Sequence, residues 1–363
     1  MKKTIFCSFL VSLALCSASV ARVYGQNNTA APLKVGAYYF DGWTGKTSHI
    51  SRSLKEDYQE RAPVWGWVTS TPAIIRKQVT AAVKADLDFF TFCWYYSELS
   101  KHNKAEPRNN ALEIFVNSKD KQGLKFNLLV ANHYGYIIGP ADWDKVSKIW
   151  LDLFEMNAHL KFNDKPLISF LSLKMLMSSF GSAAKIKVAL DQLRAGAVKR
   201  GLKGVSIGIS TSPDEKEIAL AKQAGFDVLT GYNYHDQTLI NGQSVSPITA
   251  ISKREKAVWS QFLKFDMPYI PVSTLNWDPR AWDEINKIKR PSPHFKGYAP
   301  ASVFQSVKGL KDWVLENNPT RSKDQIAVLY AWNEYGEGAW LTPSVTYKNG
   351  LLEAVKKALG SSD

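Results

Sequence analysis

Two glutamates near the end of the chain have the type and spacing needed for acid–base chemistry. Glu334 and Glu337 lie three residues apart in the run W-N-E-Y-G-E-G at 332–338. Cleavage of a glycosidic bond uses two carboxyl groups, one that protonates the leaving oxygen and one that acts as base or nucleophile. Neighbouring carboxyls push each other's pKa apart, which leaves one acid and one base near neutral pH. We therefore predict that both are catalytic; the alternative is that one of them caps a helix or pairs with a lysine.

The elements that must position this pair alternate between strand and helix. Short apolar, β-branched or aromatic runs predict eight strands, at 33–40, 87–95, 125–133, 166–171, 204–210, 226–234, 268–275 and 325–332. Amphipathic patterns predict helices at 72–85, 111–122, 143–160, 183–200, 214–225, 248–265, 301–317 and 350–359. Eight such units predict an α/β fold with a single (β/α)8 TIM barrel over 26–363. A doubly wound open sheet is the alternative, but the first strand lacks the glycine-rich phosphate turn typical of that fold.

Barrel enzymes carry their chemistry at the C-terminal ends of the strands. Aromatic residues mixed with polar ones gather at the predicted strand ends, a composition that suits sugars, which present both C–H and hydroxyl surfaces. The alternative is that several tryptophans only pack the long first loop, 41–70, whose length itself indicates a lid or wall. The predicted substrate-binding residues are Tyr39, Asp41, Trp43, Trp94, Tyr95, His133, Tyr234, His235, Trp277, Asp278, Trp332 and Asn333.

Some of these residues have an equally good structural interpretation. The histidines His133 and His235 could instead hydrogen-bond to backbone carbonyls, and Asp278 could pair with Arg280. A metal site that combines these histidines with an aspartate lacks the usual ligand spacing, so we predict no metal. Cys93 is expected to be a small core residue, since no histidine lies near it in sequence to activate a thiol nucleophile.

The N-terminus and the overall charge bear on location and partners. Lys2 and Lys3 precede an apolar run at 5–20 and then small residues, which predicts a signal peptide at 1–25 and a secreted or periplasmic protein without a membrane span after processing. Lipid anchoring at Cys16 is less favoured, because Leu15 before it is bulky.

The formal net charge is +13, but the lysines are scattered singly along helices, so we predict no nucleic-acid partner. An acidic polysaccharide partner and the oligomeric state stay open.

The run at 332–338 resembles the W-N-E-aromatic-x-E-G motif of glycoside hydrolase family 99 and its WbsX-like relatives. The segments 35–43 and 89–95 resemble the first and second strands of that group. The resemblance implies a secreted or luminal (β/α)8 endo-α-mannosidase that acts with net retention and needs no metal or other cofactor. It also implies that Glu334 is the base for the sugar 2-hydroxyl, which forms a 1,2-anhydro sugar. Glu337 is then the acid that protonates the leaving group and afterwards activates water.

The resemblance leaves the substrate and two other functions open. The stretch 271–280 keeps only the outline of the family's strand 7 motif, and the first loop offers His49 as its one histidine. The partner is therefore an oligosaccharide or polysaccharide that could be an α-mannan, another α-glycan or a host glycan. A catalytically inactive glycan-binding protein on the same barrel is the main alternative. A sugar-nucleotide transferase is the third possibility, but export would separate it from nucleotide sugars, and no phosphate-binding turn is visible.

Overall fold

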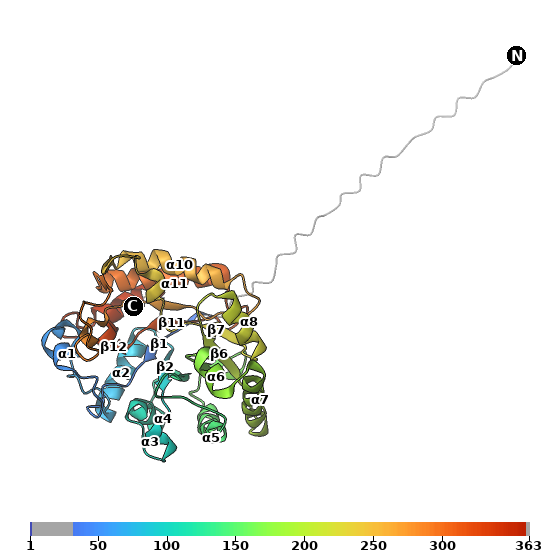
Figure 1. The fold of residues 1–363 in the computed structure, drawn as a ribbon. Helices are drawn as coiled ribbons and strands as arrows, with labels where there is room; N and C mark the ends of the chain where they lie inside the picture. Colours follow the sequence, from blue (N-terminus) through green and yellow to red (C-terminus); the bar gives the residue numbers. More distant parts are fainter. Residues whose placement is uncertain (2–31, 361–363) are drawn as a thin grey trace. The chain divides into compact units, whose positions relative to one another are not determined.

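The computed structural model describes Met1 and residues 32–360, so the expected signal peptide lies, apart from Met1, outside the described residues. Parallel strands form a ring with helices around it (Figure 1). β1 pairs with β2 and β11, and the order continues from β2 through β3, β5 and β6 to β7 and from β11 to β9. The strands are β1 Lys34–Tyr39, β2 Phe89–Trp94, β3 Lys125–Val130, β5 Lys165–Phe170, β6 Ser206–Ser210, β7 Val228–Thr230, β9 Val272–Thr274 and β11 Ile326–Tyr330.

The ring closes between β7 and β9. A parallel bridge joins Leu229 to Tyr269, just ahead of β9. The N–H of Leu229 donates to the Pro268 carbonyl at 2.9 Å, and the N–H of Ile270 donates to the Leu229 carbonyl at 2.8 Å. The predicted (β/α)8 barrel is thus confirmed. Seven of the eight predicted strands contain an observed one, and the eighth, 166–171, is offset by one residue from β5. Every residue of β2 is buried, as expected for a strand packed on the barrel interior on one face and on helices on the other.

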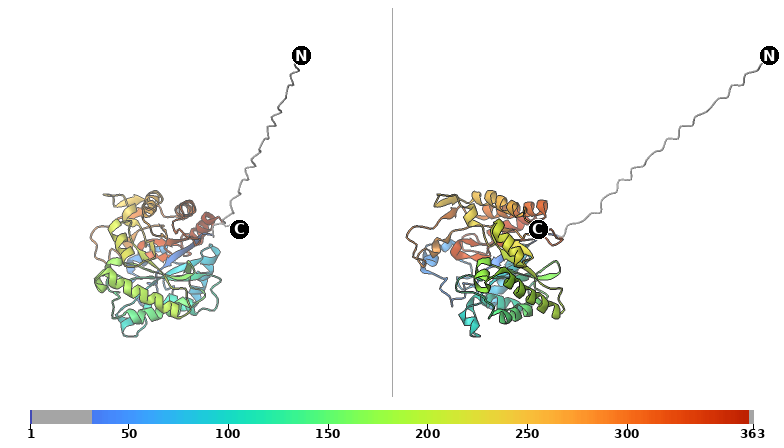
Figure 2. Two further views of the ribbon diagram at one scale, coloured as in Figure 1. Left: turned by 90° about the vertical axis from the view of Figure 1, so that its right-hand side faces the viewer. Right: turned by 45° about the vertical axis from the view of Figure 1, so that its right-hand side comes forward.

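Helices lie between the strands, around the ring (Figures 1 and 2). Each of the eight predicted amphipathic segments overlaps an observed helix, although α4 and α5 end five and six residues before their predicted ends. Thr71 caps α2, where its side chain accepts from the N–H of Ile74, and Pro72 occupies the first turn, a position that proline favours. The helix α6, after β5, was not among the predicted segments. The main helices are α2 Pro72–Lys84, α4 Asn110–Asn117, α5 Trp143–Phe154, α6 Leu173–Phe180, α7 Ala183–Lys199, α8 Glu215–Gln223, α10 Thr249–Phe262, α11 Pro300–Asn317 and α12 Gly350–Leu359.

Short helices and strand pairs lie in the loops at the C-terminal ends of the strands. They are α1 Arg52–Glu56, α3 Glu98–Lys101 and α9 His235–Thr238, with two small strand pairs, β8 Val245–Pro247 with β10 His294–Lys296 and β12 Asn333–Glu334 with β13 Ala339–Trp340. β4 Lys161–Phe162 pairs antiparallel with β5. None of the helices in the described part of the chain has the length and apolar character needed to cross a membrane.

The long first loop is a folded segment that packs against the residues after β11. The N–H of Val64 donates to the Pro343 carbonyl, and Thr69 donates to the Trp43 carbonyl, both at 3.0 Å. Besides α1, the loop contains a 3-10 turn at Gln59–Arg61. The loop therefore has a fixed path beside the turn that carries the two glutamates.

Candidate active site

A cavity of about 410 Å3 at the C-terminal ends of the strands is lined by both Glu334 and Glu337. Its walls come from the ends of several strands and from the loops that follow them. The lining residues are Phe40, Ser48, His49, Cys93, Tyr95, Arg108, Leu129, Ala131, His133, Tyr136, Leu171, Tyr232, Trp282, Ile285, Asn286, Glu334 and Glu337. Apolar and aromatic walls with a few convergent polar groups are typical of small-molecule sites.

A tight turn between β12 and β13 brings the two glutamates to the same cavity. β12 pairs antiparallel with β13, and the residues between them form a 3-10 turn at Tyr335–Glu337. Gly338 ends this turn with φ at +71°, a left-handed conformation that favours glycine. Gly336 packs under Trp282, where an added Cβ would come within 1.7 Å of the indole ring. Gly336 and Gly338 of the sequence motif thus allow the backbone to form this tight turn, and the turn lets both glutamates face the cavity.

Tyrosine hydroxyls bind the two glutamate carboxyls, and within residues 32–360 neither carboxyl forms an ion pair. The Tyr232 hydroxyl donates to Oε1 of Glu334 at 2.5 Å, and the Tyr330 hydroxyl donates to Oε2 of Glu337. Burial raises the pKa of Glu334 to about 7, although the Tyr232 hydrogen bond acts in the opposite direction. Burial raises the pKa of Glu337 to about 8. At neutral pH Glu337 therefore holds its proton, while Glu334 is divided between the acid and the carboxylate.

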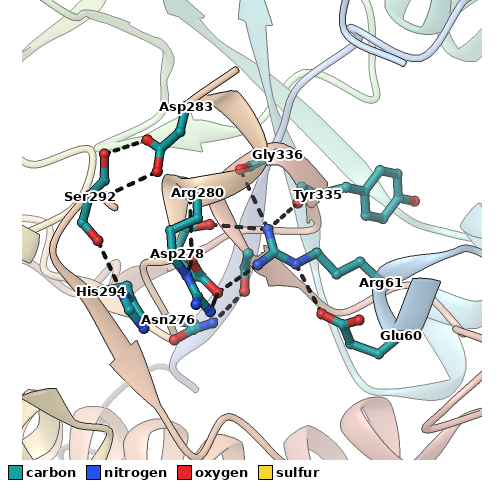
Figure 3. Close-up of polar contacts among 11 residues, drawn as sticks. Glu60, Arg61, Asn276, Asp278, Arg280, Asp283, Ser292, His294, Tyr335 and Gly336 are labelled. Atoms are coloured by element: carbon teal, nitrogen blue, oxygen red, sulfur yellow. Dashed lines mark hydrogen bonds and ion pairs between the residues drawn. The ribbon is translucent and has the colours of Figure 1, made fainter. Parts of the chain in front are cut away.

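An ion-pair network holds this turn from behind (Figure 3). Arg61 is 1 % exposed, and its Nη1 donates to the carbonyls of Tyr335 and Asp278, both at 3.0 Å. Its Nη2 donates to the Asp278 carboxylate at 2.6 Å, and Arg280 Nε binds the same carboxylate at 2.7 Å. The N–H of Asp278 in turn donates to the Glu337 carbonyl at 2.7 Å. Arg61 and Asp278 therefore join the first loop, the loop after β9 and the turn at Tyr335–Glu337.

Tyr95 and His133 are the predicted substrate-binding residues that line the cavity with the glutamates. Their rings meet edge to face with centroids 6.0 Å apart. His133 Nδ1 lies 3.0 Å from the Tyr134 carbonyl, the backbone contact that the sequence left open. Burial lowers the pKa of His133, so its imidazole is neutral at pH 7 and offers Nε2 as an acceptor when Nδ1 donates to that carbonyl.

Three predicted residues lie buried beneath the cavity and hold the end of the last strand. The Trp43 indole donates to the Asn333 carbonyl at 2.8 Å, and the Asn333 side-chain oxygen accepts from the N–H of Phe40 at 2.9 Å. The Trp332 indole donates to the side-chain oxygen of Gln78 at 2.7 Å. None of the three lines the cavity, so the structure places them as supports for the segment that carries Glu334 and Glu337.

Two further predicted residues from the end of β1 are also buried away from the cavity. Asp41 accepts from the Ser70 hydroxyl at 2.9 Å and from the N–H of Ala111 at 2.6 Å. Tyr39 packs between Phe90 and Phe92, with ring centroids 5.3 Å and 4.8 Å away. These contacts tie β1 to the loops that follow it and to β2.

The remaining predicted residues lie elsewhere at this end of the barrel. Trp94 is buried against Tyr96 and Trp150, and the Tyr234 hydroxyl hydrogen-bonds to that of Tyr269 at 2.6 Å. His235 and Trp277 stack at 3.7 Å with partly exposed rings, outside the cavity that holds the glutamates. Asp278 pairs with Arg280, as one of the two sequence interpretations has it, and also with Arg61.

The structure adds site residues that the sequence interpretation missed. Tyr232 lines the cavity, and Tyr330 binds Glu337 without being part of the lining. Both lie within predicted strands, two residues ahead of Tyr234 and Trp332, so the alternation of side chains along a strand is the signal that could have pointed to them. Arg108 comes from the loop after β2, with its guanidinium 5.0 Å from the centre of the Tyr136 ring and 2.6 Å from Glu106. No periodicity encodes the path of that loop.

His49 and Cys93 also line the cavity. Burial and the nearby Arg108 charge lower the pKa of His49 to about 4, so it is neutral. Burial raises the pKa of the Cys93 thiol well above its ordinary value, which keeps it protonated and unreactive as a nucleophile. Within the described ranges, no group of three or more histidine, cysteine, aspartate and glutamate side chains is arranged to hold a metal ion.

The fold and the site define a (β/α)8-barrel protein with a paired-carboxyl pocket at the C-terminal mouth. The chain belongs to the family described as Glycosyltransferase WbsX, whose model matches residues 40–355. That match runs from the end of β1 into α12 and includes the whole cavity lining. No curated protein matches the chain.

Solved structures of glycoside hydrolases share the fold. A family 99 endo-α-mannosidase from Bacteroides thetaiotaomicron aligns over 90 % of this chain and 98 % of its own, at 12 % identity and a TM-score of 0.61. Its complex with BIS-TRIS-propane aligns over 90 % and 94 %, at 13 % identity and 0.59. An endo-β-mannanase/endo-β-glucanase from Prevotella bryantii aligns over 91 % of this chain and 49 % of its own, at 13 % identity and 0.51. At these identities the similarity is one of fold.

Proposed function

We propose that the protein is a glycoside hydrolase that cleaves an α-linked, α-mannoside-like glycan with net retention. The observation that carries this proposal is the pair Glu334 and Glu337, which face one cavity with tyrosine partners and with pKa values raised by burial to about 7 and about 8. Family membership and the fold shared with the endo-α-mannosidases support it. We further propose that the protein is exported and acts without a metal or cofactor.

The first step uses the two carboxyls in different protonation states. The Glu334 carboxylate takes the proton of the sugar 2-hydroxyl, and that oxygen attacks the anomeric carbon. The bond to the leaving oxygen breaks as Glu337 gives that oxygen its proton, and a 1,2-anhydro sugar results. Tyr232 stabilises the Glu334 carboxylate before it accepts the proton, since a hydrogen bond to the charged form favours it.

The second step reverses the two roles. Glu337, now a carboxylate, takes a proton from water, and the resulting hydroxide attacks the anomeric carbon. The bond from that carbon to the 2-oxygen breaks, and the oxygen recovers its proton from Glu334. Both glutamates return to their starting states, and two inversions give net retention.

The cavity lining supports a smaller set of substrate contacts than the sequence suggested. We assign the sugar to Tyr95, His133 and Tyr136, with Arg108 as a hydrogen-bond donor for its hydroxyl oxygens. The buried tryptophans and Asp41 then act through the backbone that they support.

The test replaces each glutamate by glutamine and measures turnover on α-mannans and other α-glycans. Each variant should lose about 10²- to 10⁴-fold in kcat, the usual contribution of a positioned acid or base. Nuclear magnetic resonance of the first-formed product reports its anomeric configuration, which should match that of the substrate. Glu353→Gln, on the exposed face of α12, is the matched control and should retain wild-type turnover. Near-normal turnover in Glu334→Gln or Glu337→Gln contradicts the assignment.

The family description favours a second candidate, transfer of a sugar from an activated donor. The same cavity would then bind an acceptor hydroxyl in the place of water. Incubation with nucleoside diphosphate sugars and a glycan acceptor distinguishes the hydrolase from the transferase. Transfer without hydrolysis supports the transferase. Calorimetric glycan binding by a wild-type protein that neither hydrolyses nor transfers supports the inactive binding protein.

A further inference from the structure

A second cavity, of about 840 Å3, adjoins the ion-pair network behind the turn at Tyr335–Glu337. Arg61, Asp278 and Arg280 contribute to its walls, together with the β8–β10 strand pair and residues from β13 and the loop that follows it. It shares no lining residue with the cavity that holds the glutamates. Neither the family match nor the proposed reaction gives this second cavity a role.

Two buried polar atoms in residues that line this cavity have no hydrogen-bond partner. Asn276 is 4 % exposed, and its amide nitrogen donates to the Gly338 carbonyl at 2.6 Å, which leaves its side-chain oxygen unpaired (Figure 3). Trp340 is 3 % exposed, and its indole N–H is also unpaired. Buried polar groups are nearly always satisfied, so an unpaired acceptor and an unpaired donor in the walls of one cavity favour a ligand with hydroxyl groups.

The charge of the cavity favours an anionic ligand. The charges of Arg61 and Arg280 are balanced by those of Asp278 and Glu60, with which they form ion pairs. Arg290 and Lys296 are exposed on the rim, and no side-chain partner is found for either among the described residues. A guanidinium and an ammonium without side-chain partners at the same cavity are suited to a carboxylate or a sulfate.

An aromatic wall completes the cavity. Tyr298 and Tyr347 flank Trp340, with ring centroids 4.9 Å and 6.2 Å from it. Both tyrosine hydroxyls donate to backbone carbonyls, so the rings, and not the hydroxyls, are left for a ligand. Aromatic rings pack well on the C–H face of a sugar.

We propose that this second cavity binds an acidic sugar residue, one that carries a carboxylate or a sulfate. Arg290 and Lys296 bind the anionic group, the Trp340 N–H and the Asn276 oxygen bind hydroxyls, and the aromatic wall contacts the ring. The site needs no chemistry at Glu334 and Glu337, so it stands whether or not the protein hydrolyses glycans.

Calorimetry with the full-length Glu337→Gln variant tests this binding without turnover. The ligands are trigalacturonate for the carboxylate, a chondroitin sulfate tetrasaccharide for the sulfate, maltotriose as the neutral sugar, and inorganic phosphate and sulfate as bare anions. One acidic oligosaccharide should bind at least about ten-fold more tightly than maltotriose and than either bare anion, since charge-assisted hydrogen bonds add to the sugar contacts. The one that binds identifies the anionic group.

Two variants and a matched control locate the binding. Arg290→Gln with Lys296→Gln should weaken it by about ten-fold or more. Trp340→Phe keeps an aromatic ring but removes the indole N–H, and should weaken the binding by about three- to ten-fold. Arg76→Gln with Lys77→Gln, exposed on α2, removes the same charge elsewhere and should change nothing. Undiminished binding in the Arg290 and Lys296 variant overturns the proposal, as does equal affinity for maltotriose or for a bare anion.

Discussion

Two carboxyl environments lie back to back across the turn at Tyr335–Glu337, and they differ in their partners. On the cavity side, Glu334 and Glu337 accept from tyrosine hydroxyls, and burial sets their pKa values at about 7 and about 8. Behind the turn, burial also acts to raise the pKa of Asp278, but the hydrogen bond from Arg280 and the charges of Arg61 and Arg280 outweigh it. The pKa of Asp278 therefore ends below its ordinary range.

The difference separates structure from chemistry. An arginine beside Glu337 would hold it as a carboxylate at neutral pH and so remove its proton-donating form. At this turn, cations bind the carboxylate that holds the backbone, and neutral hydroxyls bind the two carboxyls that we propose exchange protons. Arg108, which also lines the cavity with the glutamates, is paired with Glu106 at 2.6 Å.

The largest expected effect is on stability, in Glu337→Gln at alkaline pH. The folded-state pKa of Glu337, about 8, lies above the ordinary value of 4.5, so the folded protein holds a proton that the unfolded chain releases. Raising the pH from about 4.5 to about 8 therefore destabilises the wild type but not the glutamine variant. Each pKa unit corresponds to about 1.4 kcal/mol, so the variant should be more stable by about 4 kcal/mol at pH 8.

Urea unfolding at pH 4.5, 6 and 8 measures this difference. The gap between the two proteins should be small at pH 4.5 and widest at pH 8. Glu353→Gln provides a matched exposed position, where the gap should stay flat with pH. A constant gap for Glu337→Gln across the range would show that this carboxyl titrates normally and would remove the basis for its role as acid.

The next largest effect is expected for Arg61→Met, which removes one arginine from the ion-pair network behind the turn. The methionine fills part of the buried space but leaves the carbonyls of Tyr335 and Asp278 without their donor and removes one partner of the Asp278 carboxylate. Loss of one member of a buried ion pair costs about 3 to 5 kcal/mol, and Arg280 retains part of the pairing, so we expect a loss of about 3 kcal/mol. kcat should also fall, because the turn loses its anchor.

Urea unfolding and steady-state kinetics check this expectation. Arg200→Met removes ion pairs to Asp152 and Glu155 on the surface and is the matched control, with little expected change in either measurement. Arg61→Lys keeps the charge without the forked geometry, and should recover stability better than kcat if the arginine positions the turn. Equal losses for Arg61→Met and Arg200→Met would mean that the buried pair does not hold the turn.

The barrel could be predicted from the sequence because each strand carries its own signal. β2, with six buried residues, reads as a continuous apolar run, and the surrounding helices show amphipathic spacing. The location of Glu334 and Glu337 at the mouth followed from their place after the last strand. Local composition therefore determines which element a residue belongs to and at which end of the barrel it lies.

The direction in which each side chain points could not be predicted in the same way. Trp43, Trp332 and Asn333 follow barrel strands at the predicted end of the barrel. Their side chains, however, bind donors and acceptors of neighbouring segments and do not line the cavity. Their partners, such as Gln78 on α2, are distant in sequence and carry no local signal. Arg108 reaches the cavity from a loop, and no local sequence signal predicts this position, because tertiary contacts alone determine it.

The smallest expected effect sharpens the comparison at the hydrogen bond between Tyr232 and Glu334. Tyr232→Phe removes a donor that favours the Glu334 carboxylate, so the pKa of Glu334 should rise from about 7. If Glu334 is the base and Glu337 the acid, kcat/KM rises with pH through the first pKa and falls through the second. The acidic limb of that bell should therefore move up by about one pH unit in the variant, while the alkaline limb, set by Glu337 and its own partner Tyr330, stays in place. Tyr134→Phe, an exposed tyrosine, should leave both limbs unchanged. A shift of the alkaline limb alone would reverse the two roles, because the group that lost its tyrosine partner would then be the acid.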